Sequence, residues 1–149
     1  MPTFQFRLAS LLRLHEATRD ECRAHLAEAF RAEELLNNRL GELEQALAAL
    51  KHECRQGSRP GTVDVDRLID SQRYEFVMLA ERATLRQQGE MLAAEIERRR
   101  EALVAADREV RILEKLRETQ RQQHQRDQQR REVKLLDEVA ARSYESERD

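Results

Sequence analysis

Apolar side chains recur along both halves of the chain at alternating steps of three and four residues. In the first half this run consists of Leu36, Leu40, Leu43, Leu47, Leu50 and Cys54. In the second half it consists of Leu92, Ile96, Leu103, Ala106, Val110 and Leu113, with Arg99 as the one polar member. This spacing keeps one face of a helix turned toward a partner helix. The two runs therefore predict a pair of packed α-helices.

Upstream of residue 26 the same rhythm is less regular. It passes through Phe4, Leu8, Leu11, His15, Thr18 and Cys22. Reaching Leu26 then requires two successive steps of four, which predicts a local unwinding of the coiled coil.

One break interrupts the helical pattern. Two glycines and a proline meet within residues 57–61, a combination typical of a turn. We expect a first helix over about residues 4–55, a loop over about 56–62 and a second helix over about 63–145. The short loop makes the two helices antiparallel. The fold class is therefore all-α, and residues 1–149 form a single elongated two-helix coiled-coil hairpin.

The second helix is predicted to outlast the first. Folding back around Ser58 sets residue 4 beside roughly residue 113, so the later part of the second helix overhangs. Residues 117–132 contain no aliphatic side chain and no Phe, Tyr or Trp. A helix that is polar on all sides has no face to bury. We expect a single, exposed and partly frayed helix in this segment.

Apolar side chains return near the end of the sequence. They are Val133, Leu135, Leu136, Val139, Ala140 and Tyr144. Their spacing places them on one face of an amphipathic helix. The sequence leaves two interpretations open: a C-terminal docking stripe for another protein (Leu135, Leu136, Val139 and Tyr144), or self-association with a second copy.

A surplus of apolar residues follows the predicted loop. One set, which we expect to face the first helix, is Phe76, Leu79 and Ala83. A second set, roughly 200° around the helix, is Tyr74, Met78 and Leu85. A two-helix hairpin buries only one such set. Either the buried face slips here, or the second set is a partner surface near the hairpin tip.

Composition supports this picture and excludes several functions. The chain is 38% charged with four glycines, two prolines and no tryptophan, which favours long helices over a globular core. Its net charge of −2 does not favour binding to nucleic acid. No apolar run is long enough to span a membrane and no signal peptide is apparent, so we expect a cytoplasmic protein. Motifs for catalysis, cofactor binding or metal binding are absent, so we expect neither an enzyme nor a bound cofactor.

Three segments of the chain are informative together: FQFRLASLLRLHE (Phe4 to Glu16), EIERRREALVAADREVRILEKLRE (Glu95 to Glu118) and RREVKLLDEVAARSYE (Arg130 to Glu145). In this arrangement they resemble the FliJ family of flagellar type III export proteins. The resemblance implies an antiparallel coiled coil, similar to the stalk of rotary ATPases. It also implies a non-catalytic role in coupling the export ATPase FliI to the export gate protein FlhA, with escort of export chaperones as a further role.

The resemblance also implies where the partners bind. The helix ends away from the loop would enter the ATPase ring, through Phe4, Leu8, Leu11, Val110 and Leu113. The gate would meet the hairpin tip, at Tyr74, Met78 and Leu85. The protein would then associate peripherally with the export apparatus of the inner membrane. The alternative function is a self-associating coiled-coil scaffold or adaptor, for which the terminal apolar stripe is a dimer seam.

Overall fold

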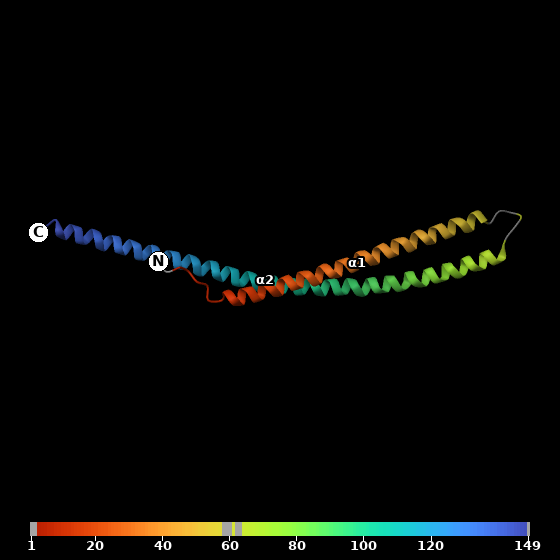
Figure 1. Ribbon diagram of the computed structural model, residues 1–149, viewed down its shortest axis with the longest axis horizontal. Coiled ribbons are helices and arrows are strands. Elements are labelled where there is room, and N and C mark those ends of the chain that lie inside the picture. The colour runs from red at the N-terminus through yellow and green to blue at the C-terminus, as the bar shows by residue number, and fades with distance from the viewer. Residues whose placement is uncertain (1–2, 58–60, 62–63, 149) are drawn as a thin grey trace. The chain divides into compact units, whose positions relative to one another are not determined.

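Two α-helices make up all the regular structure that is described. The computed structural model describes residues 3–57, 61 and 64–148. Helix α1 spans Ala9–Gly57 and helix α2 spans Val65–Ser146 (Figure 1). No strand occurs in these residues, and the two helices form a hairpin, which confirms the predicted all-α fold. Most of the predicted loop, residues 58–60 and 62, lies outside the described residues.

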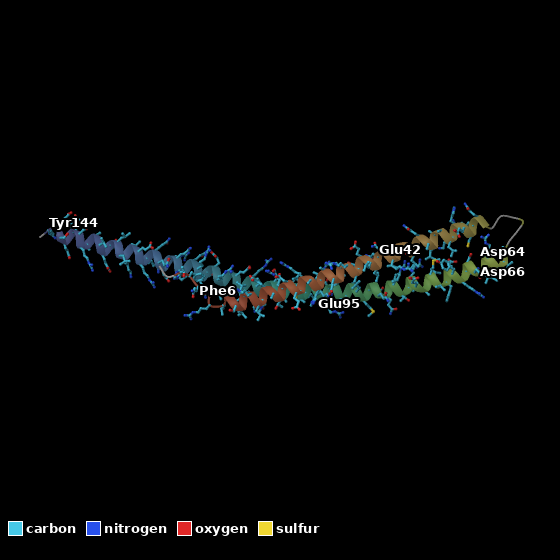
Figure 2. The ribbon with its side chains drawn as sticks, in the orientation of Figure 1. Phe6, Glu42, Asp64, Asp66, Glu95 and Tyr144 are labelled. Carbon is cyan, nitrogen blue, oxygen red and sulfur yellow. The ribbon has the colours of Figure 1, made fainter. Side chains whose placement is uncertain are left out.

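The start of α2 is fixed by a side-chain cap. Asp64 Oδ1 accepts hydrogen bonds from the backbone N–H groups of Asp66, at 3.2 Å, and Arg67, at 3.4 Å. These groups have no partner within the helix, so the carboxylate satisfies them and also places negative charge at the positive end of the helix dipole. Asp64 and Asp66 lie together at this end of α2 (Figure 2). Just before them, Gly61 has a φ of 137°, a conformation that glycine adopts without strain.

The packed residues fall into two units. The hairpin unit comprises Glu21–Leu103, and the terminal unit combines Met1–Asp20 with Val104–Asp149. In the hairpin unit the helices run antiparallel. Leu36 of α1 lies against Gly89 of α2, whereas the later residue Leu47 packs against the earlier residue Met78.

A regular core seam joins α1 and α2 in the hairpin unit. Buried and half-buried residues alternate at steps of three and four along both helices. In α1 they are Cys22, Leu26, Ala29, Glu33, Leu36, Leu40, Leu43, Leu47, Leu50 and Cys54. In α2 they are Ser71, Glu75, Met78, Arg82, Leu85, Gly89, Leu92, Ile96, Arg99 and Leu103. The predicted heptad pattern is confirmed, and it continues back along α2 as far as Ser71 without a slip.

The two apolar sets near the loop are the reverse of the expected ones. Met78 is 3% exposed and packs against Leu43 and Leu47, with Leu85 beside them, whereas Phe76 is 74% exposed. The expectation that Phe76, Leu79 and Ala83 face the first helix is therefore wrong. The heptad register, continued backward from Leu92 in steps of three and four, passes through Leu85 and Met78 and misses Phe76.

The terminal unit has a small core of its own. Leu12, Val110 and Leu113 are buried together, and Phe6 packs against them. Along α1 the buried face continues through Leu12, His15 and Arg19, so the two successive steps of four expected before Leu26 do not occur. Leu12, rather than Leu11, is the core residue.

The N-terminal residues reach farther along α2 than expected. The rings of Phe4 and His124 lie 5.8 Å apart with a 46° tilt, so residue 4 lies near residue 124 rather than 113. The reason is that α1 begins at Ala9 rather than near residue 4. A non-helical chain covers up to about 3.3 Å per residue, against about 1.5 Å in a helix.

The last part of α2 carries no second helix against it. Residues 129–148 are exposed at every position, in the blue stretch of Figure 1. Contrary to the prediction from the sequence, the polar segment 117–132 is not exposed at every position. Phe4 contacts His124, and Asp127 and Gln128 are half-buried. Helix α2 has 82 residues and α1 has 49. The overhang that the sequence predicted from the unequal helix lengths is therefore present.

Candidate partner-binding surfaces

An apolar surface lies on α2 close to the hairpin loop. A shallow hollow there is lined by Ile69, Gln72, Arg73, Phe76 and Val77, which we call the tip surface. These residues follow one another at helical spacing and so share one face of α2. All five are exposed. At 100° per residue this face lies about 180° around the helix from Met78, so α2 is apolar both toward α1 and away from it.

The residues expected to contact an export gate are divided by this geometry. Tyr74 is exposed on α2. Met78 is buried against Leu43 and Leu47, and Leu85 packs on the same cluster. Met78 is not available to a partner while the hairpin is folded, so its assignment to a partner surface is wrong. Leu85 is half-buried, and its assignment stays a prediction. The exposed apolar side chains in this part of α2 include Ile69, Phe76 and Val77 of the tip surface.

The residues expected on the ATPase side are divided too. Leu8 and Leu11 are exposed, and Phe4 is half-buried against His124. Val110 and Leu113 are buried with Leu12 and hold the terminal unit together, so they are structural residues in this conformation. Exposed apolar residues that the sequence reasoning missed here are Val104, Ile112 and Leu116.

The C-terminal stripe is fully available. Leu135, Leu136, Val139 and Tyr144 are all more than half exposed. Tyr144 projects from the end of α2, away from the described part of the N-terminal segment (Figure 2). An apolar stripe on a helix with no packed neighbour is a typical docking surface for another protein.

Ion pairs between α1 and α2 flank the core seam of the hairpin unit. Arg39 donates to Glu81 Oε1 from Nη2 at 2.7 Å and from Nε at 2.9 Å. Arg86 donates to Glu44 Oε1 at 3.2 Å. The hydrogen bonds from Arg39 to Glu81 raise the pKa of the Arg39 guanidinium. Both pairs are exposed, so they contribute more to the register of the two helices than to stability.

Arg99 is the one polar residue in the predicted seam of the second helix, and its hydrogen bonds explain why it is accommodated there. Its Nη1 donates to the backbone carbonyl of His25 at 2.5 Å, and its Nε donates to Glu95 Oε1 at 3.0 Å. The side chain thus crosses from α2 to the backbone of α1. Hydrogen bonds from Arg99, and next from Arg98, lower the pKa of Glu95.

The residue after Arg99 also contacts α1. The guanidinium of Arg100 lies 5.4 Å from the ring centre of Phe30, which is a cation–π contact.

Metal-ligand clusters and membrane-spanning helices are both absent from the described residues. Within residues 3–57, 61 and 64–148, no three His, Cys, Asp or Glu side chains gather as a metal ion would require. No helix of the described chain is sufficiently long and apolar to traverse a bilayer.

Comparison with known protein families identifies the chain. The family model described as "Flagellar FliJ protein" matches residues 4–149. The chain belongs to the FliJ family. Its members are non-catalytic components of the flagellar export apparatus, so this FliJ-family chain is a component of that apparatus. No curated protein and no solved structure matches it significantly.

Membership of the FliJ family gives the exposed surfaces a context. A component of an export machine works through contacts with other components, and the hairpin unit and the terminal unit each carry exposed apolar side chains. The sequence signal for the tip surface was present, since Ile69, Phe76 and Val77 lie off the heptad register that Leu92 and Ile96 establish. Extending that register toward the loop would have separated the core residues from the surface residues.

Proposed function

We propose that this FliJ-family chain is a stalk-like coupling protein between the export ATPase ring and the export gate. The terminal unit would bind a FliI-like ATPase, and the tip surface would bind an FlhA-like gate protein. The observation that carries the proposal is that each unit combines a packed helix pair with apolar side chains that no described segment covers.

The proposed mechanism is mechanical and associative. A coupling protein has to keep its shape under load, and two helices locked in register are stiffer than either helix alone. The core seam, the Arg39–Glu81 pair and the Arg99 bond to His25 fix that register in the hairpin unit. The protein would act in the cytoplasm, peripherally attached to the inner-membrane export apparatus, and would also escort export chaperones. It would carry out no chemical step itself.

The ATPase contact is tested by measuring ATP hydrolysis by the FliI-like protein. The full chain should stimulate hydrolysis, and the double variant Leu136→Asp, Val139→Asp should stimulate it less, because two charges disrupt the exposed C-terminal stripe. Leu35→Asp is the matched control, since Leu35 is equally exposed but lies in the hairpin unit. No stimulation by the wild-type chain, together with no binding in a pull-down, would remove the proposal.

The gate contact is tested by affinity for the FlhA-like protein. The double variant Phe76→Ala, Val77→Ala should bind about tenfold or more weakly, because truncating an apolar anchor commonly costs 1–2 kcal/mol or more, roughly tenfold. Leu35→Ala again serves as the control. Circular dichroism should show unchanged helicity in all these variants. Equal affinity for wild type and the double variant would reject the tip surface as the gate contact.

A further inference from the structure

Helix α2 carries a second heptad pattern on the side facing away from α1. Starting in the tip surface, steps of four and three connect a set of exposed residues. They are Ile69, Arg73, Phe76, Ala80, Ala83, Gln87, Glu90 and Ala94, which we call the second seam. The same spacing in the core seam joins α2 to α1, so the second seam has the geometry to pack against one further helix.

The side chains of the second seam are larger on one side of its middle than on the other. Its middle is Ala80 and Ala83, which allow a close approach between two helices. Bulky residues, Ile69 and Phe76, lie on one side of this middle, and the shorter residues Gln87 and Ala94 lie on the other. An antiparallel copy with Ala80 opposite Ala83 places each large side chain against a smaller one, as well-packed interfaces require.

The charges of the second seam select the same arrangement. With Ala80 opposite Ala83, Arg73 of each copy faces Glu90 of the other, and the pair occurs twice because of the twofold symmetry. A parallel arrangement would set Arg73 against Arg73 and Glu90 against Glu90, which is unfavourable. Among the described residues Arg73 and Glu90 take part in no ion pair, so both are available. The net charge of −2 adds little repulsion between copies.

We propose that the second seam is a homodimer interface. Two copies of the chain pack their α2 helices antiparallel, with Ala80 and Ala83 at the centre and Arg73–Glu90 pairs on both sides. The residues bordering the seam agree with this register, since Val77 lies near Thr84 and Asp70 near Met91 of the other copy, without like charges opposed. The dimer covers Phe76, so a chain in the dimer has no tip surface left for another partner.

The proposal is tested by charge reversal and rescue on the full-length chain. Sedimentation equilibrium over a range of concentrations gives the monomer–dimer constant. Arg73→Glu or Glu90→Arg alone turns two attractive pairs into two repulsive ones, and should weaken dimerisation about tenfold or more. The double variant Arg73→Glu, Glu90→Arg exchanges the charges and should restore the wild-type constant within about threefold.

Two controls make the result decisive. Arg108→Glu changes the net charge by the same amount at an exposed site outside the seam and should leave the constant unchanged. Leu136→Asp tests the C-terminal stripe. A wild-type chain that stays monomeric, single reversals without effect, a swap that fails to rescue, or a dimer abolished by Leu136→Asp alone would each overturn the proposal. No other protein is present, so the outcome does not depend on the proposed ATPase or gate contacts.

Discussion

Replacing Met78 by alanine should destabilise the hairpin unit, whereas the same replacement at Met91 should not. Both are methionines of α2, but Met78 is 3% exposed and Met91 is 68% exposed. Substitution by alanine gives a small gain in helix propensity at either site. The difference between the two variants therefore reports on burial.

The size of the effect follows from the packing. Burying a methionine side chain contributes about 1.5–3 kcal/mol, and the space left between Leu43 and Leu47 adds a cavity penalty. A two-helix seam closes over a gap more easily than a globular core does. We therefore expect about 2 kcal/mol for Met78→Ala, at the low end of the range for buried methionines, and less than about 0.5 kcal/mol for Met91→Ala.

The measurement is urea-induced unfolding followed by circular dichroism at the helical band. The transition midpoint should fall for Met78→Ala and stay close to wild type for Met91→Ala, with similar slopes for all three proteins. Leu47→Ala and Leu35→Ala form a second buried and exposed pair on α1. Equal midpoints for Met78→Ala and Met91→Ala would refute the assignment of Met78 to the core seam.

Three further sets of variants test other features of the helices. Asp64→Ala removes the cap of α2 and should cost about 1 kcal/mol, whereas Asp64→Asn, which keeps an accepting oxygen, should cost less in the same urea titration. Gly41→Ala should stabilise the chain by up to about 1 kcal/mol through helix propensity, because nothing lies within 4 Å of the added methyl group. Gly89→Ala should stabilise it less, because its added methyl group meets Leu36 at 3.4 Å. A loss of stability in Gly41→Ala would contradict this expectation. The pKa of Glu95 is lowered in the folded state by Arg99 and Arg98, so its stabilising contribution is present above its unfolded pKa and is lost as pH falls through the folded pKa. Thermal melts should therefore show a full difference between wild type and Glu95→Gln above about pH 4.5 that shrinks as the pH falls below it, and a difference that is the same at every pH would exclude this origin.

The sequence was sufficient for the helical hairpin and for most of its core. Leu43, Leu47, Ile96 and Val110 were predicted from spacing alone, because a heptad pattern with few polar exceptions defines the buried face of a long helix. The unequal lengths of the helices also followed from the position of the glycines and proline in the loop. These features depend on local spacing, which the sequence displays directly.

The tip surface was misassigned for a physical reason. In α2 near the loop, Phe76 and Val77 are larger and more apolar than the core positions on the opposite face, which include Ser71 and Glu75. Hydrophobicity alone therefore favours the wrong face. Continuity of the register with the rest of the helix, where the core is unambiguous, identifies the correct one.

The contacts of Phe4 and Phe6 with the terminal unit had no such signal in the sequence. Nothing in the sequence of residues 3–8 distinguishes the first turn of a helix from the non-helical segment that places Phe6 on the terminal core and Phe4 against His124. The contact joins residues far apart in the chain, and one aromatic ring on a polar helix leaves no periodic pattern. Only the three-dimensional structure shows it.

The uninterrupted core seam also limits how the sequence can change in length during evolution. A single inserted residue in α2 would rotate every later side chain by about 100° and turn Leu92 and Ile96 away from α1. Insertions and deletions should therefore accumulate in the loop and beyond residue 129, or occur as whole heptads matched in both helices. The positions of length changes in related chains would then mark the limits of the region in which α1 and α2 pair.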